Sequence, residues 1–179
     1  NSVNSFTVAG LKTDKGKIQD AEEGIAAAFK QVGYNANFEI TATVTVDTFN
    51  DNSGTGFGIM LRDDIYIDKN DKSILSNYVA AGCYGTSSAA KFCYYRDNPA
   101  SISSSNTGRL DISAQHTLSI KRSGTTVTVK FDNYTYTTVA DFDLRGVDSE
   151  YMYICLYSTR GTAVTFTNVT YTDLGEGQA

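Results

Sequence analysis

The chain has 179 residues, of which 41% are hydrophobic and 20% are charged, and its net charge is -5. These totals exclude a disordered chain, and no apolar run is long enough to cross a bilayer as a helix. The negative charge, without a dense stripe of Lys and Arg, argues against nucleic acid or a membrane as a partner. The length fits one domain over residues 1–179.

The composition favours strands and turns. It is rich in Thr, Ser, Asn, Gly and Tyr, with 1 Pro and 0 Trp. β-Branched and aromatic residues suit strands, and the small polar residues suit turns, so we predict an all-β fold. The chain begins at Asn1 without an initiator Met or an export signal, which predicts that such a signal was removed or lies upstream.

One segment near the N-terminus has a helical pattern. Residues 20–32 (DAEEGIAAAFKQV) contain good helix formers and an Asp that can cap a helix. The pattern favours a short helix, although Gly24 and the strand-rich context oppose it. The apolar positions at helical spacing are Ile25, Ala28, Phe29 and Val32.

The next two segments alternate with period two. Residues 37–48 (NFEITATVTVDT) place Phe, Ile, Ala and Val on one side and Glu, Thr and Asp on the other, which is typical of a half-exposed strand. Turn-prone residues follow, and residues 57–62 (FGIMLR) alternate again, with Arg62 on the side opposite Phe57. We predict that the two strands form an antiparallel hairpin.

The C-terminal half also consists of short strand-like segments separated by turns. Residues 116–121, 127–131 and 134–138 are separated by short Ser/Gly and Asp-Asn turns and predict a meander. Residues 151–158 and 163–172 flank a TRGT turn and predict a last hairpin. About a dozen short strands favour a two-sheet antiparallel sandwich or jelly roll.

The three cysteines have no metal-binding spacing. Cys83 and Cys93 lie in two strand-like runs, and a hairpin centred near Ser88 would place them directly opposite each other. Facing strand positions have the Cβ separation that a disulfide needs. We predict a Cys83 to Cys93 disulfide with Cys155 reduced, and two buried free thiols are the alternative.

Five segments together resemble a known group of modules. They are KGKIQDAEEGIAAAFKQV, NFEITATVTV, GFGIMLRDDIYID with NYVAAGCYG, HTLSIKRSGTTVTV and YMYICLYSTRGTAVTFTNVTYTD. Their order is similar to an accessory module of extracellular bacterial polysaccharide-degrading proteins, common beside pectate lyase domains. The resemblance implies a concanavalin A-like sandwich, an extracellular or cell-surface location, linkage to other domains, and a strand over residues 24–30 where the residue pattern favours a helix.

Tyrosines dominate the candidate binding surface. The strand 151–158 places Tyr151, Tyr153 and Tyr157 opposite an aliphatic face, as either an open platform for sugar or a second buried layer. A second cluster of Tyr78, Tyr84, Phe92, Tyr94 and Arg96 shares one face if the hairpin register is right. The predicted ligand-binding residues are Arg62, Asp64, Tyr66, Tyr84, Tyr94, Arg96, Tyr153, Tyr157 and Arg160.

Catalytic patterns are sparse. His116 is the only His and has no adjacent nucleophile, and the 5 Glu show no period-two pair. In DDIYIDKND, Lys72 stands where an EF-hand needs an oxygen donor, so no cofactor is required and a structural calcium ion is left open.

The sequence therefore predicts no enzyme but a carbohydrate-binding module that tethers a secreted or cell-surface protein to polysaccharide, either pectin or a neutral plant glycan. A structural or adhesive spacer domain is the first alternative. A polysaccharide lyase or glycoside hydrolase is the third reading, in which Tyr66 and Arg62 would serve as base and carboxylate-neutralising group.

Overall fold

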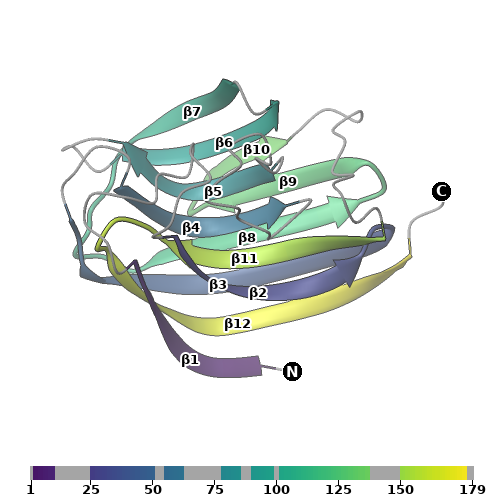
Figure 1. Cartoon of the computed structure of the whole chain (residues 1–179), viewed down its shortest axis with the longest axis horizontal. Helices are drawn as coiled ribbons and strands as arrows, with labels where there is room; N and C mark the ends of the chain where they lie inside the picture. The colour runs from purple at the N-terminus through teal and green to yellow at the C-terminus, as the bar shows by residue number, and fades with distance from the viewer. Residues whose placement is uncertain are drawn as a thin grey trace, which may run out of the picture.

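A computed structural model describes residues 2–10, 25–50, 55–62, 78–85, 90–98, 101–137 and 150–176. These residues form twelve strands in two six-stranded antiparallel sheets, and none of them is helical. Figure 1 shows the sheets face to face, with the strands running along the long axis of the molecule. The predicted all-β sandwich is confirmed.

Each sheet draws on both halves of the chain. The first sheet has the order β1 (Ser2–Ala9), β12 (Ala163–Glu176), β3 (Ala36–Thr48), β8 (His116–Ser123), β9 (Thr126–Phe131), β10 (Tyr134–Thr137). The second has the order β2 (Ala26–Gly33), β11 (Tyr151–Ser158), β4 (Thr55–Arg62), β5 (Tyr78–Gly85), β6 (Ala90–Asn98), β7 (Ser101–Arg109).

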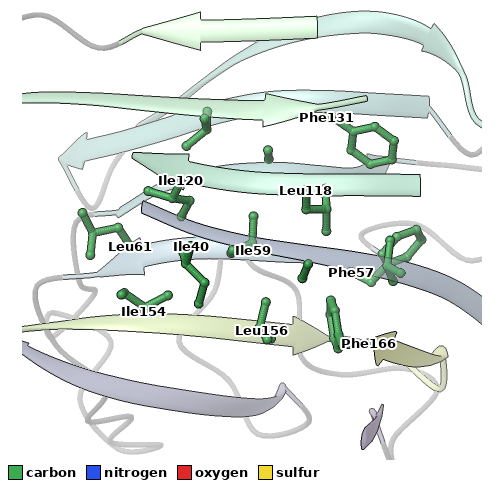
Figure 2. Packing of buried hydrophobic residues seen from close by; sticks show 14 of the residues in the cluster. Ile40, Phe57, Ile59, Leu61, Leu118, Ile120, Phe131, Ile154, Leu156 and Phe166 are labelled. Atoms are coloured by element: carbon green, nitrogen blue, oxygen red, sulfur yellow. The ribbon is translucent and has the colours of Figure 1, made fainter. Parts of the chain in front are cut away.

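The main core lies between the sheets. Inward residues at period two along each strand interdigitate there, as the alternation in the sequence predicts (Figure 2). From the second sheet come Phe57, Ile59 and Leu61, all fully buried. Ile40 and Phe166 meet them from the first sheet (Figure 2). Burying such side chains contributes about 1.5–3 kcal/mol each, so this layer holds the two sheets together.

The predicted N-terminal helix is wrong. Residues 26–33 form the edge strand β2, paired along its whole length with β11. The strand over residues 26–30 implied by the resemblance is therefore confirmed. Ala and Lys are good helix formers, but helix propensity differs by only about 0.7 kcal/mol or less among ordinary residues, so the hydrogen bonds and apolar contacts offered by β11 override it. Residues 20–24 of the predicted helix lie outside the described ranges.

Both long hairpins predicted from the sequence are also wrong. β3 and β4 belong to different sheets, as do β11 and β12, so each connection crosses the sandwich. The two crossings meet at one corner, where Thr159 N donates to Gly56 O at 2.9 Å and Asn50 N donates to Thr162 Oγ1 at 3.2 Å. The predicted meander is confirmed, because β8, β9 and β10 are neighbours in chain order.

The predicted disulfide is contradicted by the register of β5 and β6. Cys83 lies opposite Lys91, and Cys93 lies opposite Ala81, so the hairpin midpoint is one residue earlier than expected. Positions two residues out of register on facing strands are about 7–8 Å apart, too far for a disulfide. Cys83 is a free, buried thiol, and so is Cys155.

These two thiols should be unreactive in the folded protein. Burial raises the pKa of the Cys83 thiol to about 12 and that of Cys155 to about 11, the latter slightly offset by nearby Arg62. Because the thiolate is the nucleophile, iodoacetamide at pH 8 should leave both unmodified until urea unfolds the chain. Peptide mapping by mass spectrometry checks this, and rapid labelling of either thiol without urea would contradict it.

The same shifts predict alkaline destabilisation. A thiol whose pKa is higher in the folded state stabilises the protein fully below its unfolded pKa, near 9, and loses this contribution as pH rises toward its folded value. Each thiol should remove about 1.4 kcal/mol per pH unit between pH 9 and 11. Urea unfolding at pH 8 and 10 measures the slope, which should be shallower after Cys83→Ala and Cys155→Ala.

Candidate functional site

The outer face of the second sheet unites the two clusters predicted from the sequence. Strand register places Tyr153 opposite Arg62, Arg62 opposite Tyr78, and Tyr78 opposite Arg96. Directly opposed residues of antiparallel strands point to the same face. The register error of two residues at the cysteines preserves this face, since side chains alternate with period two. The tyrosines of β11 and the β5–β6 hairpin therefore share one surface.

The centre of this face is buried. Tyr157 is 0% exposed, Tyr78 1% and Tyr153 9%, and they pack with Met60 and Cys155 in a second apolar cluster. The sequence allowed either an open platform for sugar or a second buried layer on this face. At Tyr157 the structure shows the buried layer. An open stacking platform must be sought elsewhere on the same sheet.

Arg62 lies within this buried layer. Its guanidinium is 5.8 Å from the centre of the Tyr78 ring, and its Nη1 is 3.5 Å from the Met60 sulfur. Its side chain is 8% exposed. A cation held over an aromatic ring in apolar surroundings is poorly hydrated and interacts strongly with an approaching anion. Arg62 is thus a largely covered cation that packs against Tyr78 and Met60 on the outer face of the second sheet.

The accessible part of the face lies on β2 and β11. Phe29 is 55% exposed and Tyr151 is 37% exposed, two of the four large hydrophobic side chains exposed within the described ranges. The Phe29 ring meets the Tyr153 ring edge-on at a centroid distance of 6.1 Å. Exposed Gln31 lies directly opposite Tyr153. We call the exposed Phe29, Gln31 and Tyr151, together with the largely buried Tyr153 between them, the aromatic patch.

Sequence reasoning missed Phe29 and Gln31 because it placed them in a helix. A period-two reading of residues 26–33 would have found both, since it sets Phe29 and Gln31 against Ala28 and Lys30. The small alanines made the helical reading stronger. The pairing partner β11, more than a hundred residues away in sequence, decides the matter.

The other predicted residues are placed as follows. Arg160 lies in the corner turn between β11 and β12, is 7% exposed and has a φ of 49°, so it is not part of the aromatic patch. Asp64 and Tyr66 lie outside the described residues. For Tyr84, Tyr94 and Arg96 the structure describes the backbone position only, on the outer face of the second sheet by register.

The single histidine belongs to the other sheet. His116 Nδ1 is 2.8 Å from an Asp132 carboxylate oxygen, and its Nε2 is 2.7 Å from the Asp111 carbonyl oxygen. These contacts join the start of β8 to neighbouring turns, so His116 has a structural role. Within the described ranges, no three His, Cys, Asp or Glu side chains gather as metal ligands. No helix among the described residues could span a membrane.

Comparison with known proteins links this fold to polysaccharide-degrading enzymes. No family model matches the chain. Pectate lyase L of Thermoclostridium stercorarium is 32% identical over 174 residues, which is 95% of this chain but 13% of that protein. The chain therefore spans about an eighth of the length of this relative.

Solved structures share the fold at low identity. A Saccharomyces cerevisiae protein of unknown function has a TM-score of 0.66 at 13% identity and covers 98% of this chain and 91% of its own. A family 7 alginate lyase in complex with product has a TM-score of 0.60 at 10% identity, over 94% of this chain and 79% of its own.

These comparisons correct one prediction. The sequence analysis expected no enzyme, whereas the sequence relative is named a pectate lyase and solved structures with this fold include alginate lyases. Association with polysaccharides, the coarser part of the functional prediction, agrees with these comparisons.

Proposed function

We propose that this chain is a polysaccharide-binding β-sandwich of a longer extracellular polysaccharide lyase, and that its aromatic patch contacts the glycan. The observation that carries the proposal is the exposure of Phe29 and Tyr151 on the outer face of the second sheet, on either side of the Gln31 and Tyr153 pair. Sugar rings present a C–H face that packs on aromatic rings, while their hydroxyls need polar partners. The patch offers both.

Electrostatics bear on which glycan is bound. The net charge of -5 repels polyanions at long range, but Arg62 lies directly beside Tyr153 in the adjacent strand. A uronate carboxylate placed over Tyr153 would approach this guanidinium. The name of the sequence relative supports an acidic glycan of the pectate type.

A second candidate function is catalysis by the sandwich itself. The favouring observation is that the match with a family 7 alginate lyase covers 94% of this chain. In such an eliminating reaction, a base removes the proton beside the uronate carboxylate while a cation stabilises the charge that develops there. Arg62 would be that cation.

One experiment separates these functions. The chain is run on affinity gels containing pectate, alginate, xylan or starch, with and without a calcium chelator, and each polysaccharide is also assayed for unsaturated products by ultraviolet absorbance. Retardation on an acidic glycan supports binding, and product formation on the same glycan supports catalysis. Absence of retardation on all four gels contradicts the proposal and favours the spacer domain. Retardation that disappears when the chelator is added indicates that binding requires a calcium ion.

Phe29→Ala should weaken glycan binding without unfolding the protein. Removing an exposed stacking ring should cost about 1–2 kcal/mol of binding, roughly a tenfold loss of affinity. The fold should lose about 1 kcal/mol or less because the ring is half exposed. Affinity gels and thermal melting measure both effects.

Ile112→Ala is the matched control for this variant. Ile112 is 42% exposed and lies in the connection from β7 to β8, and β7 is the edge strand at the opposite side of the second sheet from β2. It removes a comparable apolar surface, so it should leave glycan affinity unchanged. Equal loss of affinity in both variants would show that the aromatic patch is not the contact surface.

A further inference from the structure

The open edge between the two sheets contains a hollow whose lining shares one residue, Phe29, with the aromatic patch. β1 and β2 are the edge strands on this side of the sandwich (Figure 1). Between them lies an apolar cavity of about 390 Å³. This volume is within the range typical of small-molecule sites. It is lined by Phe6, Ala28, Phe29, Lys30, Ile40, Ile154, Leu156, Val169 and Tyr171.

Small residues on β2 create this hollow. Ala26, Ala28 and Lys30 pair with Ser158, Leu156 and Ile154, so they occupy the inward face of the strand. Leu156 and Ser158 of β11 therefore meet only the methyl groups of Ala28 and Ala26 on β2. A better-filled core would have Leu or Val at these positions, since protein interiors normally leave few voids of this size.

Lys30 places a charge at the mouth of the hollow. Its ammonium nitrogen lies 4.8 Å from the centre of the Tyr171 ring, which stacks on Phe38 on the first sheet. Lys30 thus reaches across the open edge from one sheet to the other. Among the described residues, no carboxylate forms an ion pair with it.

The chemistry of the cavity selects its ligand. We propose that this edge cavity binds a medium-chain aliphatic carboxylate, with the alkyl chain between the sheets and the carboxylate at the Lys30 ammonium. The apolar lining excludes a sugar, whose hydroxyls would lose their hydrogen bonds to water there. The adjoining groove is lined by Glu150, Asp173 and Glu176, which favours one carboxylate over a polyanion.

The position of Lys30 can also be explained as protection of the edge strand β2 against pairing with another molecule. An inward-facing charge on an edge strand discourages pairing with a second molecule. That role predicts self-association after Lys30→Gln and no change in ligand binding. The proposed site instead predicts that Lys30→Gln selectively loses carboxylate binding. This one variant therefore distinguishes the two explanations.

Calorimetric titration of the whole chain with hexanoate, octanoate and decanoate, each below its micelle concentration, tests the proposal. Affinity should rise about fourfold per methylene until the cavity is full. Ala28→Leu fills the cavity and should abolish binding. Ala27→Leu makes the same change on the neighbouring outward-facing residue and should bind like the wild type.

Lys30→Gln gives a second readout should Ala28→Leu fold poorly. It should weaken octanoate about two- to fivefold, as expected for a partly exposed ion pair, and leave octanol unchanged. The proposal is overturned by affinity that does not depend on chain length, by octanoate and octanol changing equally in Lys30→Gln, or by equal loss of binding in Ala28→Leu and Ala27→Leu.

Discussion

Tyr157→Ala should destabilise the protein by about 3–5 kcal/mol, because it empties a fully buried aromatic site. In the sheet, Tyr157 lies between Ala27 on β2 and Gly58 on β4. Neither neighbour has a side chain large enough to fill the space that its ring would leave. For a chain of this length, the melting temperature should fall by roughly 10 °C or more.

The comparison with Phe29→Ala makes this result informative. The two rings lie on the same face of the second sheet, but one is buried and the other is 55% exposed. Tyr157→Ala should change stability, and Phe29→Ala should change glycan affinity. Tyr157→Phe keeps the ring and should cost only about 0.5–1.5 kcal/mol. A stable Tyr157→Ala protein that has lost glycan binding would instead make Tyr157 the open platform.

Much of the fold could be predicted because period-two alternation is a local signal. The strand over residues 37–48 and the meander of β8, β9 and β10 follow from alternation and tight turns alone. The sheet that each strand joins could not be predicted in this way. A turn such as Thr159–Thr162 suits a hairpin equally well, and here it instead forms hydrogen bonds to Gly56 on β4 and to Asn50 beyond the end of β3.

The site was harder to predict than the fold. The shared face of Tyr153, Tyr78 and Arg96 survived a register error because shifting a strand by two residues keeps every side chain on its face. Burial along that face did not follow from any pattern. Tyr153 and Tyr151 have the same type and parity, but they are 9% and 37% exposed. This difference depends on what packs above each one.

The sheet also explains the missing disulfide. The alternation of residues 78–85 and 90–98 predicts two strands, but the Ser- and Ala-rich stretch between them does not specify where the chain reverses. Moving the midpoint by one residue moves the partner of Cys83 by two residues, to Lys91. A disulfide requires a register accurate to the residue, whereas a shared face requires only the correct parity.

Arg62→Met should separate an acidic from a neutral glycan ligand. Charge-assisted hydrogen bonds contribute about 1.5–3 kcal/mol, so affinity for a polyuronate should fall about 10- to 100-fold and become less dependent on salt. Affinity for a neutral glycan should not change. Folding should survive, since Met has a similar length and the site already contains Met60 and the Tyr78 ring.

Arg62→Lys is the matched control, because it keeps the charge but loses the planar fork that binds a carboxylate at two points. It should lose less affinity than Arg62→Met. If the sandwich is itself the lyase, Arg62→Met should also abolish unsaturated products from a polyuronate at saturating concentration, since the cation then acts on the charge that develops in the reaction. Equal losses for acidic and neutral glycans would instead assign Arg62 to the packing of the Met60, Tyr78 and Cys155 layer, and would direct the search for the carboxylate site to Arg96 on the same face.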